Sequence, residues 1–148
     1  MFKKLSAVVL ILATTGAWAQ SDLTVDSLAK GDQTKAAFAQ MVKGHKLPKW
    51  VVKGGTTTPA KEVTLGGDKY QVLEACKPHN CGAERIAILY SEQQNTMAGV
   101  YSTVKEQSGA ERLVWMNAGD KLSIDGKTVL FAALTGSLEN HPDAFNYK

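Results

Sequence analysis

Six consecutive residues, Cys76-Lys77-Pro78-His79-Asn80-Cys81, hold both cysteines of the chain and one of its three histidines. A disulfide between these cysteines would close a small ring, whose loop-closure entropy contributes only about 2 kcal/mol to folding stability. Such a ring shapes its own loop more than the whole fold. Pro78 fixes one backbone angle and restricts the residue before it, so the ring would present His79 in few conformations. Little ordering entropy would then remain to be lost on binding.

Two other interpretations of this stretch stay open at this point. The ring could be a stapled hairpin tip whose histidine is merely solvated. Alternatively, Cys76, His79 and Cys81 could ligate zinc, although their spacing is tight and the sequence offers no evident fourth ligand. We therefore expect a disulfide rather than a metal site, and we expect no cofactor.

Outside the ring, the sequence shows no catalytic motif. The HExxH, GxSxG, phosphate-loop and dinucleotide-binding patterns are missing, and the acidic residues form no evident pair. His45 follows a predicted helix end and His141 precedes a proline, so both histidines are interpreted as structural. The chain is therefore predicted to be a binding domain and not an enzyme. Its rigid, cationic, imidazole-bearing loop suits insertion into an acidic cleft.

Residues 1–19 have the pattern of a cleaved secretory signal peptide. Lys3 and Lys4 precede an apolar run, and Ala17-Trp18-Ala19 places small residues at the two positions that a signal peptidase reads. We expect cleavage after Ala19, export to an oxidising compartment, and one mature domain over residues 20–148. The apolar run is too short to span a bilayer comfortably, so no membrane contact is expected after cleavage. An oxidising compartment also favours the disulfide.

The charge balance argues against a nucleic-acid partner. The whole chain has 17 basic and 14 acidic side chains, and loss of Lys3 and Lys4 with the signal peptide leaves the mature domain close to neutral. Domains that bind nucleic acids are usually strongly basic, at least over one face.

The hydrophobic pattern predicts helices at both ends of the mature domain and strands between them. Residues 22–45 are predicted to be helical, with Asp32 or Thr34 as a cap and Gly44 at the end. Residues 50–52 resemble a short strand, and residues 54–59 a loop. From residue 60 the period is two, which predicts strands over residues 63–65, 70–76, 84–91, 97–104 and 112–116. Residues 128–134 are apolar nearly all round and are predicted to form a helix buried against the sheet.

Short polar turns separate the predicted strands, so neighbouring strands should pair antiparallel. The fold class is therefore α+β: a single antiparallel sheet of about five strands, flanked by N- and C-terminal helices. The ring lies between two adjacent strands and should project from one end of the sheet as a disulfide-closed loop.

The ring resembles the protruding loop of the inhibitor-of-vertebrate-lysozyme (Ivy) family, which is usually written Cys-Lys-Pro-His-Asp-Cys. Further stretches that resemble this family are residues 27–31, residues 44–48, and the run from residues 123–127 through residues 146–148. The resemblance implies a homodimeric periplasmic inhibitor of C-type lysozymes, which protects peptidoglycan. It also implies that Lys77, Pro78, His79 and Asn80 contact lysozyme, with His79 leading the loop into the active-site cleft.

One departure from the family pattern is visible, because Asn80 stands where aspartate is usual. The change removes either a negative charge near acidic lysozyme residues or a carboxylate that orients His79.

Two alternative functions fit the same loop. The protein could regulate the bacterium's own lytic transglycosylases, which also use an acidic residue on peptidoglycan. It could also be a small periplasmic cell-wall enzyme. Turnover of a glycan substrate by the mature protein would favour an enzyme, whereas dose-dependent protection against added lysozyme would favour an inhibitor.

Overall fold

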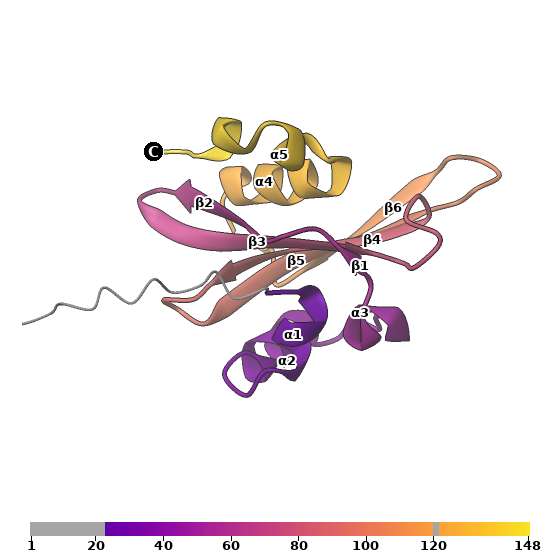
Figure 1. Cartoon of the computed structure of the whole chain (residues 1–148), viewed down its shortest axis with the longest axis horizontal. Coiled ribbons are helices and arrows are strands. Elements are labelled where there is room, and N and C mark those ends of the chain that lie inside the picture. Colours follow the sequence, from indigo (N-terminus) through magenta and orange to yellow (C-terminus); the bar gives the residue numbers. More distant parts are fainter. Residues whose placement is uncertain (1–22, 120–121) are drawn as a thin grey trace, which may run out of the picture.

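The computed structural model describes residues 23–119 and 122–148. One β-sheet forms the middle of the molecule, with the N-terminal helices on one face and the C-terminal helices on the other (Figure 1). The predicted signal peptide lies outside the described residues. Within these ranges, no helix has the length and apolar character needed to cross a membrane.

All strand pairs of the sheet are antiparallel, as predicted. The strands are β1 (Thr56–Thr57), β2 (Lys61–Leu65), β3 (Asp68–Cys76), β4 (Glu84–Ser91), β5 (Thr96–Val104) and β6 (Glu111–Met116). Their order is β1-β3-β4-β5-β6, and β2 pairs with β3 on the same edge as β1. The predicted α+β class is confirmed, and the structure adds β1 inside the stretch predicted to be a loop. Two threonines are too short a run to show a period of two.

The side chains of the strands alternate between two hydrophobic clusters, one on each face of the sheet. In β4, Ile86, Ile88 and Tyr90 join the cluster beneath the N-terminal helices, as their predicted common face requires. Ala87 and Leu89 point to the opposite cluster, beneath the C-terminal helices. Because helices cover both faces, β4 is buried on both sides along most of its length.

The stretch predicted to be helical over residues 22–45 contains α1 (Val25–Lys30) and α2 (Lys35–Val42). Thr34, one of the two predicted caps, directly precedes α2, but its hydroxyl donates to the Leu28 carbonyl at 2.7 Å rather than capping the helix. Gly44 follows α2 with a φ of 82°, a conformation that glycine adopts at little cost and that ends the helix. α2 packs on β5 through Phe38 and Met41, which are buried.

The short strand predicted over residues 50–52 is wrong, because these residues lie in α3 (Lys49–Lys53). Pro48 is extended just before the helix, and its carbonyl accepts a hydrogen bond from the Val51 amide at 3.1 Å. A short apolar run has no periodicity that separates a strand from one helical turn. Tertiary contacts decide here, since Val51 is fully buried in the cluster beneath the N-terminal helices.

The predicted C-terminal helix is α4 (Ile124–Thr135), which is followed by α5 (Ser137–Asn140) and the 3-10 helix η1 (Pro142–Phe145). Ser123 caps α4 by accepting the Gly126 amide hydrogen at 3.1 Å. Val129 and Leu130 are buried against the sheet, as predicted. The expectation that residues 128–134 are buried is wrong for Thr128 and Phe131, which are exposed, Phe131 by 46%. A helix on the surface of a sheet buries one side, so an apolar sequence does not by itself remove the outer side from water.

Candidate functional site

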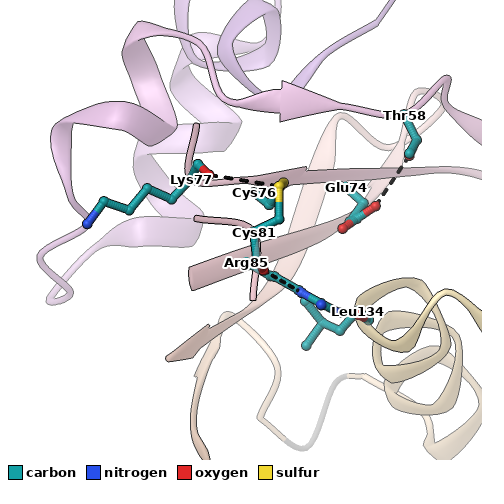
Figure 2. The surroundings of a disulfide bond; sticks show 7 residues. All are labelled: Thr58, Glu74, Cys76, Lys77, Cys81, Arg85 and Leu134. Carbon is teal, nitrogen blue, oxygen red and sulfur yellow. Dashed lines mark hydrogen bonds between the residues drawn. A yellow bond between two sulfur atoms is a disulfide. The ribbon is translucent and has the colours of Figure 1, made fainter. Parts of the chain in front are cut away.

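The candidate site is the loop between β3 and β4, which a disulfide closes between Cys76 and Cys81 (Figure 2). Cys76 is the last residue of β3, and the two Cα atoms are 4.8 Å apart. The predicted disulfide is confirmed. Both thiols are therefore unavailable as zinc ligands, and the described residues contain no group of three side chains that could hold a metal ion.

Inside the ring, Lys77 to Asn80 form a tight turn. The Asn80 amide donates to the Lys77 carbonyl at 3.0 Å. Pro78 occupies the second position, and His79 occupies the third with a φ of 62°. Proline followed by a positive φ is the pattern of a type II turn, in which glycine or asparagine usually holds the third position. Histidine there costs about 1–2 kcal/mol of backbone strain. The rest of the ring must therefore hold His79 in place.

The four residues predicted to contact a partner are brought together by this one turn. His79 is exposed at the tip, whereas Lys77, Pro78 and Asn80 are half-buried. No hydrogen bond joins the Asn80 side chain to any part of the chain that the structure describes. The turn thus presents an imidazole on a backbone with little freedom, which is the arrangement that the ring and Pro78 predict.

The base of the loop is tied to both helical layers by two consecutive residues of β4. The first tie involves Arg85, whose Nε donates to the Cys81 carbonyl at 2.8 Å and whose Nη1 donates to the Leu134 carbonyl at 2.6 Å. Leu134 lies in the last turn of α4, where the carbonyls attract cations. Figure 2 shows this link from the disulfide through Arg85 to α4.

The second tie is the Glu84 carboxylate, on the opposite face of the sheet. Its Oε1 lies 2.9 Å from the Lys77 ammonium, and its Oε2 accepts the Trp50 indole at 2.8 Å and the Tyr101 hydroxyl at 2.6 Å. The Lys77 amide also donates to the Glu84 carbonyl at 3.0 Å. Glu84 thus joins the loop to α3 and β5. Because the Lys77 charge is paired, it supplies less long-range attraction than a free lysine.

These contacts shift the pKa values of two groups. Burial alone would raise the pKa of Glu84, but hydrogen bonds from Tyr101, Trp50 and Lys77 outweigh it and lower the pKa below the ordinary 4.5. The pKa of Tyr101 is strongly raised, mainly by burial and then by the carboxylate that its hydroxyl bonds. Tyr101 therefore remains a neutral hydrogen-bond donor near neutral pH.

Glu84→Gln should lower the free energy of unfolding by about 1–2 kcal/mol near pH 7, because a neutral glutamine amide cannot replace the ion pair between the Glu84 carboxylate and Lys77. The folded-state pKa of Glu84 is lowered, so its carboxylate contributes stability above the unfolded pKa and loses it as the pH falls through the folded pKa. The difference between variant and parent should therefore shrink near pH 3. Urea unfolding at both pH values measures it.

Glu74→Gln is the matched control, because burial raises the pKa of Glu74 above 4.5. The Glu74 carboxyl group makes its full contribution to the free energy of unfolding below its unfolded-state pKa. That contribution is lost as the pH rises through its folded-state pKa. This variant should gain stability relative to the parent between about pH 4 and pH 7. Equal differences at low and neutral pH for Glu84→Gln would contradict the role assigned to its charge.

Sequence reasoning found the ring but missed Glu84, Arg85, Trp50 and Tyr101. Trp50 lies 34 residues from Glu84, and Leu134 lies 49 residues from Arg85. Nothing in the local sequence marks such partners, which only the fold brings together. The remaining histidines, His45 and His141, lie outside the ring and are exposed.

Comparison with known proteins places this loop in a family. The family model described as "Inhibitor of vertebrate lysozyme (Ivy)" matches residues 33–119, which include the ring. An Escherichia coli K12 protein named "Inhibitor of vertebrate lysozyme" is 63% identical over 148 residues, covering 100% of this chain and 94% of the relative. The chain belongs to the Ivy family. The resemblance seen in the sequence is therefore confirmed over its full length.

More distant relatives in the Ivy family match about half of the chain. A Pseudomonas aeruginosa protein with the same name is 29% identical over 75 residues, 49% of each chain. An uncharacterised Yersinia pestis protein is 35% identical over 89 residues, 59% of this chain and 58% of the relative. The named relatives are described as inhibitors and not as enzymes, in agreement with the prediction that the chain is not an enzyme.

Proposed function

We propose that this protein inhibits C-type lysozymes by inserting the Cys76–Cys81 loop, led by His79, into the active-site cleft. The observation that carries the proposal is the exposed His79 imidazole, held at a positive φ on a disulfide-closed turn. Membership of the Ivy family and the name of its Escherichia coli member support the target class. The proposed result is occlusion of the cleft without covalent inactivation.

The chemistry of the target explains why an imidazole would lead the loop. A retaining glycosidase places two carboxyl groups about 5–5.5 Å apart across the scissile bond. An imidazole fits this gap and carries a nitrogen on each side, so it can hydrogen-bond to both carboxyl groups. Because the turn is already fixed, binding orders little additional backbone. Lys77 and Asn80 flank the imidazole and would contact the walls of the cleft.

The location and assembly of the protein are also proposals. We infer export to the periplasm from the signal-peptide pattern of residues 1–19, and the disulfide supports an oxidising compartment. We also propose that the mature protein is a homodimer, as the family resemblance implies. Light scattering of the mature chain tests the dimer, and the N-terminal sequence of the exported protein tests cleavage after Ala19.

The function is tested by titrating a C-type lysozyme with the mature protein, residues 20–148, and measuring lysis of bacterial cell walls. Activity should fall in proportion to added protein until lysozyme is saturated. Incubation of the protein alone with cell walls should release no glycan fragments. Full lysozyme activity in excess protein contradicts the proposal. Inhibition of a lytic transglycosylase but not of lysozyme would point to an endogenous target.

A further inference from the structure

A surface pocket that no assigned role explains lies near the base of the loop. Its volume is ≈ 320 Å³, and it is lined by Gly44, His45, Lys46, Leu47, Tyr101, Thr103, Arg112 and Val114. The first four of these residues belong to the stretch over residues 44–48 that resembles the Ivy family. We call it the basic pocket, because its lining includes the basic side chains of His45, Lys46 and Arg112.

The cations of the basic pocket have no anionic partner within the described ranges. Neither Lys46 nor Arg112 forms an ion pair there, and His45 forms none either. The neighbouring Glu84 already accepts three donors, including the Tyr101 hydroxyl at the pocket wall. Glu111 precedes Arg112 on β6, so its side chain points to the other face, where it accepts the Ser102 hydroxyl.

The strand register places the basic pocket close to the base of the loop. Arg112 is paired with Thr103 across β5 and β6, and Thr103 is paired with Glu84 across β4 and β5. Neighbouring strands lie about 4.8 Å apart, so the Cα atoms of Arg112 and Glu84 are about 10 Å apart. Figure 1 shows the loop and the β5–β6 turn at the same end of the sheet.

A protein that receives the loop and contacts its base would therefore come close to the pocket. A stable interface covers about 800 Å² on each partner, which corresponds to a patch of about 16 Å radius. A patch of that radius centred on Glu84, at the base of the loop, reaches Arg112 at the pocket. Lys46 and Arg112 form no ion pair with any residue that the structure describes, and both line a concave site. Such a site suits a carboxylate, which can take two parallel hydrogen bonds from the planar guanidinium of arginine.

We propose that the basic pocket is a second docking site for the enzyme that the loop enters, and that it binds a carboxylate at the rim of that enzyme's cleft. The proposal rests on the proposed function. It assigns Lys46 and Arg112 to steering and orientation, whereas the loop blocks the cleft. Charged groups at a rim act mainly on the association rate and its salt dependence.

The test uses Lys46→Gln, Arg112→Gln and the double variant of the mature protein, titrated against a C-type lysozyme. In low salt, each single variant should inhibit about threefold to tenfold more weakly than the parent, and the double variant at least about tenfold. The loss should come from the association rate and should shrink in about 0.3 M salt, where the Debye length is shorter. Both side chains are exposed, so the variants should melt like the parent.

Two control variants separate the effect of the pocket's side chains from the effect of the protein's net charge. Lys127→Gln removes one positive charge on α4, on the opposite face of the sheet, and should inhibit within twofold of the parent. Arg112→Lys keeps the charge and should retain most of the association rate. Equal inhibition by the parent and the double variant in low salt overturns the proposal, and so does tighter inhibition by that variant.

A free anion is the competing occupant of the pocket. Inorganic phosphate titrated into the protein alone, followed by the NMR signal of the Arg112 guanidinium, should bind only above about 10 mM, as for an open exposed site. Binding below about 1 mM would overturn the proposal in favour of a small-anion site. Failure of the parent to inhibit any lysozyme would instead remove the proposed function on which the inference rests.

Discussion

Replacement of His79 by alanine should weaken inhibition of a C-type lysozyme more than about a hundredfold. Loss of a hydrogen bond to a charged group costs about 1.5–3 kcal/mol, and the imidazole is proposed to make two such bonds. The substitution also leaves the space between the two carboxyl groups empty. The free energy of unfolding should change little, because the His79 side chain is exposed. Alanine has a Cβ atom like histidine, so it keeps the backbone strain at a φ of 62°.

Two further substitutions at this position separate the contribution of the imidazole from that of the backbone conformation. His79→Asn suits the positive φ and keeps a hydrogen-bonding group, but it is shorter than an imidazole. His79→Gly removes the strain of the turn and the whole side chain. Both should inhibit far more weakly than the parent, although glycine should stabilise the fold slightly. A His79→Ala protein with the inhibition constant of the parent would show that the imidazole does not lead the loop.

Removal of the disulfide by the paired substitutions Cys76→Ala and Cys81→Ala should reduce affinity more than stability. The small ring contributes about 2 kcal/mol to folding, so the domain should stay folded. Without the disulfide, the strained turn at His79 is no longer closed, so its backbone must be ordered when it binds. Ordering one backbone residue costs about 1–2 kcal/mol. We expect inhibition to weaken at least about thirtyfold. Arg85 and Glu84 should keep the base of the loop in place.

The comparison requires both quantities from the same protein samples. Urea unfolding gives the stability, and titration of lysozyme activity gives the inhibition constant of the folded protein. A reducing agent should reproduce the effect in the parent and leave the alanine variant unchanged. The account is contradicted if the melting temperature collapses while the folded fraction inhibits as strongly as before.

The regular part of the fold was predictable because it is encoded in local patterns. β4 shows its alternation in Ile86, Ile88 and Tyr90, and the helix over residues 128–134 shows its apolar run. The strand predicted for Trp50 and Val51 is wrong because one turn of helix has no period of its own. The predicted burial of Phe131 is wrong because its exposure on the outer side of α4 depends on how the helix packs on the sheet.

The candidate site was predictable in its tip and not in its base. Two cysteines, a proline and a histidine within six residues specify a constrained turn by local chemistry alone. The positive φ of His79 and the ties through Glu84 and Arg85 depend on residues from α3, β5 and α4. Contacts over such separations in sequence follow from strand register and helix packing, which no local motif records.

The most direct test of the central claim is the crystal structure of the mature protein bound to a C-type lysozyme. The account predicts that the Cys76–Cys81 loop fills the cleft, with the His79 nitrogens within hydrogen-bond distance, about 2.7–3.2 Å, of the two catalytic carboxyl groups. Lys46 and Arg112 should then face the rim of the same cleft. A complex in which this loop points into solvent, or in which the cleft remains open to substrate, would contradict it.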